Sequence, residues 1–427
     1  MEQLRSPLTS MCMRVFQAAL QTSTEKNVVV CPFTITGCAT MLYYASEGTF
    51  STAHRQLEDS LMYSNLFDKR SDAKLVLLAF RQAIKVFTKH QLKEDDPAAI
   101  TSPEFRLTLI NRIFLPIATA EVLNPDFVEI CEKNLKIDFE ILDSSLNGRE
   151  TENAIEQWLD DHQKVQQRFD VKIPRGLIDS TYNGHRLVFA NAAHFRAGWE
   201  VPFDPRETKI APFRLIGGKL KEVELMHLTD KFPYYEDPQL GLKTMELPYY
   251  HNICTLIITV CSKKDGFMQA MEKLSNDYFL EAHLKKRMKL IRVALPKFHV
   301  QSTYEMTPLL RRIGIKEVLQ DDCVLENMSK TTPLRRTEGI HKCALMCDEE
   351  GTYVNEKSHL ELLSGQYRKS WTPPVSHSGK SDTGDKKNQE KNRPPQAEEF
   401  VANSPFLVAL RHNLTGVFLF AGCITEP

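Results

Sequence analysis

LVFANAAHFRAGWEVPFDPRETKIAPF, residues 187–213, is the stretch at which the chain changes from helical to strand-like sequence. Before it, residues 151–167 have the periodicity of an amphipathic helix. After it, TLIITV at 255–260 is a near-continuous apolar run, typical of a strand covered on both faces, and IRVALPKFHV at 291–300 indicates a further strand. Helices first and strands later, without regular alternation, predict an α+β fold with large sheets.

The composition is that of an ordinary globular protein and argues against several classes of function. Hydrophobic residues make up 42% and charged residues 26% of the 427 residues, and 54 Lys or Arg against 55 Asp or Glu leave a formal net charge of -1. This balance gives no reason to expect nucleic acid as a partner, and no apolar run is long enough to predict a membrane span. We expect one large domain over residues 1–427, without a nucleic-acid or membrane partner.

The N-terminal residues predict an amphipathic helix that starts near Ser10 rather than a secretory signal peptide. Arg5 and Arg14 interrupt the apolar block that a signal peptide requires. The 10 cysteines are scattered from Cys12 to Cys423 without a CxxC pair, which suits reduced thiols and favours a cytoplasmic location.

One segment differs in composition from the rest of the chain. Residues 365–399 hold seven Lys or Arg, five Asp or Glu, four Pro and a single aliphatic residue, Val375. Such a segment buries too little apolar surface to offset its ordering entropy, so we expect it to be disordered. Strand-like sequence flanks it on both sides, which indicates an exposed insertion within a domain.

No motif in the sequence points to an enzyme. There is no GxSxG nucleophile elbow, no HExxH zinc motif and no CxxC pair. We therefore expect no catalytic residues, no metal site and no cofactor. Arg81, Lys85 and Lys89 share a helix face that could bind a polyanion, although a solvated helix face is the preferred interpretation.

Six stretches, spread over nearly the whole chain, follow the order of motifs in one known family. They are NVVVCPFTITGCATMLYYASEGTFSTAHRQL at 27–57, LVFANAAHFRAGWEVPFDPRETKIAPF at 187–213, MELPYY at 245–250, LPKFHVQSTYEM at 295–306, IHKCALMCDEEGT at 340–352 and FVANSPFLVALRHNLTGVFLFAG at 400–422. Together they resemble the serpins, a family of serine protease inhibitors. Cys31 and Thr34 stand where that family usually has serines.

The resemblance implies a serpin-like domain of about nine helices and three β-sheets with an exposed reactive loop. Inhibitory members offer this loop to a protease and then insert it as a new strand into the central sheet. The resemblance assigns the hinge of the loop to Glu349, Glu350, Gly351, Thr352, Tyr353, Val354, Asn355 and Glu356. It assigns the region where the sheet opens to Cys31, Thr34, Asn191, His341, Trp199 and Lys297, with Glu349 beside the last two at the top of the sheet.

Alternation along an inserted strand allows the buried side chains to be predicted. Counted from Thr352, the inward-facing residues are Thr352, Val354, Glu356, Ser358, Leu360 and Leu362. Glu356 is the one acid among them, and its burial opposes insertion. Tyr353-Val354-Asn355-Glu356 also replaces the run of small residues that inhibitory members usually carry after Gly-Thr.

Family spacing from Gly351 puts the candidate reactive bond near Gly365 and Gln366, with Arg368 and Lys369 close by. A basic residue at this bond would suit the acidic specificity pocket of a trypsin-like serine protease. We expect a monomer that has such a protease as its partner.

Two hypotheses remain open: a serpin-type inhibitor that works by loop insertion, and a non-inhibitory serpin-fold protein whose loop is a substrate or a partner-contact segment. By family analogy, or with a longer N-terminus, an extracellular location also stays open.

Overall fold

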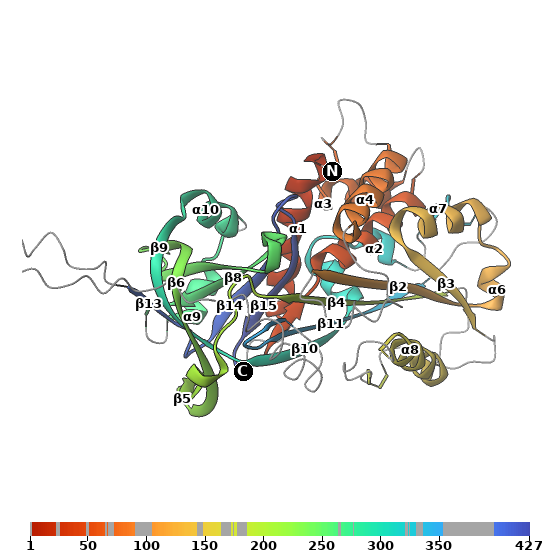
Figure 1. Cartoon of the computed structure of the whole chain (residues 1–427). Helices are drawn as coiled ribbons and strands as arrows, with labels where there is room; N and C mark the ends of the chain where they lie inside the picture. The colour runs from red at the N-terminus through yellow and green to blue at the C-terminus, as the bar shows by residue number, and fades with distance from the viewer. Residues whose placement is uncertain are drawn as a thin grey trace, which may run out of the picture.

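The computed structural model describes residues 2–22, 26–47, 51–64, 66, 72–89, 105–142, 148–163, 172–173, 175–176, 186–263, 266–275, 277–320, 323, 325–329, 336–352 and 397–427 (Figure 1). The helices are α1 (Glu2–Leu20), α2 (Pro32–Ala45), α3 (Thr52–Ser60), α4 (Ala73–Thr88), α6 (Ile117–Ala120), α7 (Pro125–Leu135), α8 (Gly148–Gln163), α9 (Phe267–Glu272), α10 (Tyr278–Lys285) and α11 (Met306–Arg312), with short 3-10 turns η1 (Pro205–Glu207), η2 (Tyr250–Asn252) and η3 (Glu317–Leu319). The strands are β1 (Val28–Val30), β2 (Arg106–Pro116), β3 (Ile137–Leu142), β4 (Arg186–Gly198), β5 (Lys209–Arg214), β6 (Leu220–Asp237), β7 (Leu242–Pro248), β8 (Cys254–Cys261), β9 (Arg287–Pro296), β10 (Phe298–Glu305), β11 (Arg336–Cys347), β12 (Gly351–Thr352), β13 (Glu398–Val401), β14 (Phe406–His412) and β15 (Phe418–Ile424). This arrangement confirms the predicted α+β class.

The central feature is a six-stranded sheet in the order β10-β11-β4-β2-β3, with β12 attached to β4. Strand β4 runs parallel to β11 and antiparallel to β2. The side chains of β4 alternate between two cores: Phe189 and Phe195 face the main core, and Val188 and Ala190 face a smaller one that includes Trp158 of α8. Since both faces are covered, β4 is apolar almost throughout, as a doubly buried strand should be.

Helices cover the two faces of this sheet unequally. Figure 1 shows α8 on one side of β2, β4 and β11, with α2, α3, α4 and α7 on the other. Helix α2 begins at Pro32, a residue suited to the first turn of a helix, and nearly all of its residues are buried. A helix that is apolar on all sides must lie in a core. Helix α2 therefore packs in the core against one face of the central sheet.

The remaining strands form one nine-stranded sheet, in which β6, an 18-residue strand, pairs with different neighbours along its length. One end of β6 pairs with β7 over Tyr234–Asp237, and most of its length pairs with β9 over Leu225–Tyr234. This nine-stranded sheet thus has two parts, β1-β15-β14-β8-β7 and β5-β6-β9-β13. With the six-stranded sheet these correspond to the three expected sheets, two of them joined through β6.

Three sequence predictions of element boundaries need correction. The stretch 291–300 is two strands in different sheets, because after Pro296 the chain leaves β9 and begins β10 at Phe298. Helix α1 starts at Glu2 rather than near Ser10, since Leu4 and Leu8 are buried and packing outweighs the helix-breaking tendency of Pro7.

The predicted insertion also ends earlier than expected. Glu398 and Glu399 already belong to β13, where Glu398 pairs with Lys243 at 2.9 Å and Glu399 with Arg292 at 2.7 Å. The rest of the 365–399 segment, except for Ala397, lies outside the described residues.

All 10 cysteines are free thiols, and eight of them are buried. Among the described helices, none combines the length and the apolar character that crossing a membrane requires.

Candidate functional site: the hinge at the top of the central sheet

After Cys347, the last residue of β11, the chain reverses direction in a tight turn. The Asp348 carboxylate accepts hydrogen bonds from the N–H groups of Glu350 (2.9 Å) and Gly351 (3.0 Å), and the Asp348 N–H donates to the Gly351 carbonyl (2.9 Å). A Cβ atom on Gly351 would lie only 2.1 Å from the Ala197 carbonyl oxygen. Glycine is therefore required for the chain to approach β4 this closely.

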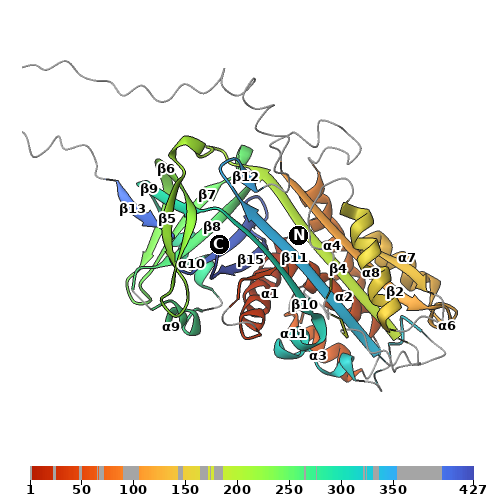
Figure 2. The same ribbon diagram turned by 90° about the horizontal axis from the view of Figure 1, so that it is seen from below.

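The turn delivers Gly351 and Thr352 to the end of β4 as the two-residue strand β12. Gly351 pairs with Gly198 and Thr352 with Ala197 in an antiparallel register. Thr352 is 1% exposed, and its hydroxyl lies 2.7 Å from the Tyr249 hydroxyl. Figure 2 shows β12 beside the end of β11, at the end of the central sheet where β4 also ends. The side chain of Thr352 thus already points into the core.

Trp199 and Phe203 hold the hinge through its backbone. The Trp199 N–H donates to the Glu350 carbonyl, its indole Nε1–H donates to the Asp348 carbonyl, and the Phe203 N–H donates to the Glu349 carbonyl, each at 2.9 Å. The Trp199 ring is also stacked on Tyr249, with ring centroids 4.4 Å apart. Trp199 therefore anchors the turn as well as filling the core.

An ion pair fixes the side chain of Glu349. Its Oε1 atom accepts from the Thr208 hydroxyl at 2.8 Å and lies 3.0 Å from the Lys297 ammonium. Lys297 also reaches Glu224 at 3.3 Å. Burial lowers the pKa of Lys297, but the carboxylates of Glu349 and Glu224 outweigh it, so this pKa lies above its ordinary value. Lys297 sits at the break between β9 and β10, so the ion pair joins the hinge to both sheets.

The other two acids of the turn are held in a less polar environment. Burial raises the pKa of Asp348 to about 6, and the charge of Glu349 adds to this; the N–H groups of Glu350 and Gly351 oppose it. Burial likewise raises the pKa of Glu350 to about 7, with further contributions from Asp348 and Glu349, while Arg196 opposes the shift. Asp348 and Glu350 therefore ionise less readily than ordinary carboxyl groups.

A second polar group lies further down the same strands, where β4 and β11 pair. The backbone N–H of Cys31 donates to His341 Nε2 at 3.1 Å, so Nε2 carries no proton. His341 Nδ1–H then donates to the Asn191 side-chain oxygen. The Thr34 hydroxyl donates to the Cys31 carbonyl at 3.0 Å. Burial lowers the pKa of His341 to about 3, which keeps the imidazole neutral.

Between these two groups, β4 and β11 part from one another. Their direct pairing runs from Arg336–Arg186 to Cys343–Ala193 and stops there, although both strands continue. Strand β12 is attached to β4 beyond this point. The arrangement can therefore accept more of the chain between β4 and β11 if their remaining pairs separate.

The structure brings together the residues that the sequence assigned to the opening of the sheet, but as two groups. Cys31, Thr34, Asn191 and His341 form the lower group, in which Cys31 acts through its backbone rather than its thiol. Trp199, Lys297 and Glu349 form the upper group.

The distal hinge residues and the candidate reactive bond are not part of this geometry. Tyr353, Val354, Asn355, Glu356, Gly365, Gln366, Arg368 and Lys369 lie outside the described residues. The contacts of Tyr249 and Thr208 with the hinge were not predicted from the sequence. Both residues belong to the quoted motifs, but nothing in their spacing indicates a contact with the hinge.

Comparisons of the sequence and of the fold with known proteins all lead to one family. The family described as Serpin (serine protease inhibitor) matches residues 6–427. Leukocyte elastase inhibitor of Sus scrofa is 24% identical over 437 residues, and leukocyte elastase inhibitor A of Mus musculus is 26% identical over 438 residues; both alignments cover 100% of each chain. The solved structure of uncleaved ovalbumin, at 18% identity, has a TM-score of 0.75 and covers 98% of this chain and 99% of that one. The chain belongs to the serpin family.

Proposed function

We propose that this serpin inhibits a serine protease by inserting its reactive loop as a new strand between β4 and β11. The observation that carries the proposal is β12, whose two residues pair with β4 beyond the point where β4 and β11 separate. A strand that continues β12 would run antiparallel to both neighbours. The names of the two leukocyte elastase inhibitors support a protease as the partner.

The length of β4 agrees with the length of loop that would insert. Strand β4 has 13 residues, so the register of β12 extended along it pairs residues 351–363 with the whole strand. Such a strand spans roughly 43 Å at about 3.3 Å per residue. Cleavage near Gly365 and Gln366, or near Arg368 and Lys369, would leave a tether that reaches the far end of the sheet with little slack.

The same register identifies the obstacle to insertion. Glu356 would lie opposite Ala193, on the face of the sheet that carries Asn191 and His341. Burial of Val354, Leu360 and Leu362 would contribute about 1.5–3 kcal/mol each. Burial of Glu356 could raise its pKa by up to about 3–5 units, at about 1.4 kcal/mol per unit. These terms are comparable, so backbone pairing decides the balance.

A trypsin-like protease is the preferred target class. Arg368 and Lys369 would suit its acidic specificity pocket, and they lie only five and six residues beyond residue 363. Lys391 and Arg393 would also be cleaved by such an enzyme, but the tether would then be far longer. Cleavage there would let the protease complete hydrolysis and leave, which is substrate behaviour.

A non-inhibitory role is the second candidate, favoured by one feature of the sequence. Tyr353-Val354-Asn355-Glu356 is bulky and charged where fast entry into the sheet requires small residues. In that case the protein would be a serpin-fold binding module or a partner-dependent chaperone, with the loop as its contact segment.

Incubation with trypsin-, chymotrypsin- and elastase-like proteases distinguishes the two roles. An inhibitor forms a complex that survives SDS because the acyl bond is trapped, and we expect this with the trypsin-like enzyme. Cleavage of the loop without a stable complex for any of the three enzymes would favour the non-inhibitory role.

A pair of variants tests whether insertion limits the reaction. Glu356→Ala removes the inward acid and is expected to raise the yield of complex severalfold, whereas Glu361→Ala removes an outward acid of the same strand and is the matched control. Equal yields for both variants and for the unmodified protein would exclude Glu356 as the obstacle.

A further inference from the structure

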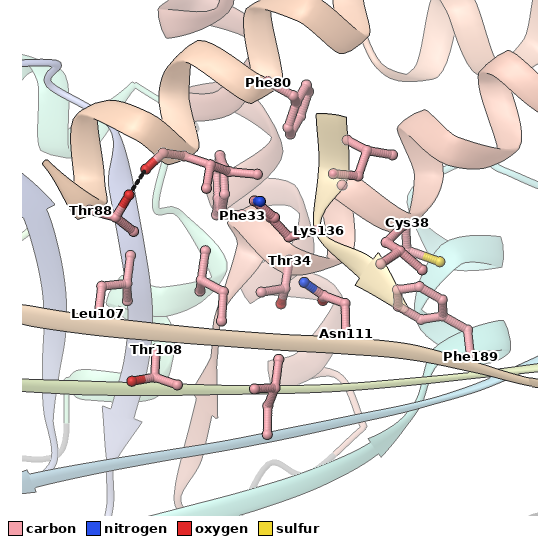
Figure 3. Close-up of a pocket in the computed structure, with 16 residues that line it drawn as sticks. Phe33, Thr34, Cys38, Phe80, Thr88, Leu107, Thr108, Asn111, Lys136 and Phe189 are labelled. Atoms are coloured by element: carbon pink, nitrogen blue, oxygen red, sulfur yellow. Dashed lines mark hydrogen bonds between the residues drawn. The ribbon is translucent and has the colours of Figure 1, made fainter. Parts of the chain in front are cut away.

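A cavity of about 230 Å³ lies between α4, the first turns of α2, strand β2 and the junction of α7 with β3 (Figure 3). Its walls are largely apolar, with Phe33 and Phe80 stacked on one side and Leu107 and Phe189 on others. Leu109 and Ile84, which also line it, are only partly buried. The hinge and the strand ends that receive it do not line this cavity, but Thr34 of the lower group does, so the cavity adjoins that group and not the hinge.

One buried polar side chain in the cavity has no partner. Asn111 of β2 is 8% exposed, and its amide makes no hydrogen bond with the described part of the chain. Its cross-strand neighbour Asn191, in contrast, accepts from His341. The amide faces the open space of the cavity, where it could donate a hydrogen bond to a ligand atom.

A cation stands at the same cavity. Lys136, which ends α7 in the left-handed conformation with φ of 55°, lines the cavity and forms no ion pair within the described residues. Figure 3 shows its nitrogen and the amide of Asn111 within the ring of lining side chains. Lys133, one turn earlier on α7, instead pairs with Glu129 at 3.7 Å. The cavity thus combines one cation, one amide donor and an apolar body.

We propose that this cavity binds a small amphipathic monocarboxylate, such as a medium-chain fatty acid. The carboxylate would accept from the Lys136 ammonium and the Asn111 amide N–H, and the hydrocarbon would lie among Phe33, Phe80 and Leu107. A cavity of about 230 Å³ is far larger than a single water needs, so a short hydrocarbon chain would fit in it. An inorganic anion would leave the apolar walls unused, and a neutral hydrocarbon would leave Asn111 and Lys136 without partners.

Gly37 of α2 offers a way to close the cavity without disturbing the fold. It lines the cavity, and a Cβ atom placed on it would have no heavy atom within 4 Å. A leucine at this position would extend into the open space, and a helix interior favours leucine over glycine. Gly37→Leu should therefore fold and exclude the ligand.

Isothermal titration of the full chain with octanoate, below its micellar concentration, tests the proposal, with octan-1-ol as the neutral probe. We expect saturable binding of octanoate that Gly37→Leu abolishes. Lys136→Gln should weaken octanoate about three- to tenfold and leave octan-1-ol unchanged, as expected for a half-exposed charge-assisted contact. Lys136→Arg should restore binding, and Lys133→Gln, the matched control on the same helix, should not change it.

Three outcomes would overturn the proposal. One is the absence of saturable octanoate binding. Another is equal binding of octanoate by Gly37→Leu and the unmodified protein, which would put the ligand elsewhere. The third is equal weakening by Lys133→Gln and Lys136→Gln, which would reduce the effect to net charge.

Discussion

At the scale of single residues, the hinge contains one ion-paired carboxylate, that of Glu349, and two acids whose pKa values are raised, Asp348 and Glu350. Glu349 is satisfied by Lys297 and Thr208, whereas burial raises the pKa of Asp348 to about 6 and that of Glu350 to about 7. For an acid whose pKa is raised on folding, the folded state binds more protons between the unfolded and folded pKa values. These two groups therefore make the folded state less stable as the pH rises from about 4 to about 7.

Asp348→Asn is expected to remove the part of this pH dependence that Asp348 contributes, which lies between about pH 4 and pH 6. The amide oxygen can still accept from the N–H groups of Glu350 and Gly351, but it does not ionise. The melting temperatures of the variant and of the unmodified protein are measured from pH 5 to pH 8. The value for the variant minus that for the unmodified protein should increase as the pH rises. A constant difference between the two across this range would contradict the assignment.

The pH dependence has to be measured as a difference between the variant and the unmodified protein, because buried histidines change the stability with pH in the opposite direction. Burial lowers the pKa of both His194 and His341 to about 3, so the unfolded state binds more protons below pH 6.5. Their contribution to stability rises with pH up to that value and is common to both proteins. The difference between variant and unmodified protein thus reports the hinge alone.

The side chain of Asn413 is engaged in local hydrogen bonds although it begins a glycosylation motif. It begins an Asn-Leu-Thr sequon, yet its amide donates at 2.8 Å to the Asn252 carbonyl, the Asn252 side-chain oxygen and the Thr255 hydroxyl. We expect no glycan at Asn413 after expression through a secretory pathway. A mass shift at this peptide on glycosidase treatment would show that these bonds open and that the prediction is wrong.

At the level of residues, the resemblance to serpins named residues that share a place, and it left out partners that come from elsewhere in the chain. It grouped Cys31, Thr34, Asn191 and His341, which form one hydrogen-bonded group; their part in opening the sheet stays a prediction. The contact of Thr352 with Tyr249 joins residues 103 positions apart and follows only from the register of β12 on β4.

At the scale of elements, the turn Asp348–Gly351 decides whether a new strand can start. It reverses the chain within four residues and places β12 against β4 through the only residue type that fits at Gly351. The carbonyl groups of the turn are held by N–H groups of the segment that follows β4. Under the proposed insertion mechanism, the first two residues of the new strand are therefore already paired with β4 in the intact chain.

Gly351→Ala is expected to lift β12 from β4, because its methyl group would meet the Ala197 carbonyl oxygen at 2.1 Å. Loss of the docked turn should lower stability by about 1–3 kcal/mol. Amide hydrogen exchange offers the sharper measurement: protection should fall at Trp199 and Phe203, whose N–H groups donate to the turn.

Gly37→Ala is the control for this exchange experiment, since a methyl group there meets open space. Unchanged protection at Trp199 and Phe203 in Gly351→Ala would mean that the turn accommodates a side chain and that glycine is not required.

Element boundaries show what pattern alone could not predict. The stretch 291–300 reads as one strand because both halves are apolar, but Pro296 and Lys297 carry the chain from one sheet to another. Alternation within each half gives no signal of which sheet a strand joins. The long β4, in contrast, was predictable, since burial on both faces requires apolar residues on both sides of the strand, and β4 carries them in LVFA and AA.

At the scale of the whole molecule, the central sheet has five long strands and, in the two-residue β12, the beginning of a sixth. Conversion would replace the direct pairing of β4 with β11 by two new sets of pairs, one on each side of the inserted strand. The six stretches that resemble serpin motifs made this architecture predictable from the sequence, and the family match over residues 6–427 agrees with it. Whether this particular loop enters the sheet depends on the residues after Thr352, above all on Glu356.

Thermal unfolding before and after loop cleavage tests the central claim most directly. Limited trypsin digestion needs a variant in which glutamine replaces the other basic residues of the loop, Lys357, Lys380, Lys386, Lys387, Lys391 and Arg393. Cleavage of its loop is then restricted to Arg368 and Lys369, and mass spectrometry would identify the new end. About a dozen new backbone pairs, at about 1 kcal/mol each, should raise the melting temperature by on the order of 10 °C. A cleaved protein that melts at the same or a lower temperature than the intact one would contradict loop insertion.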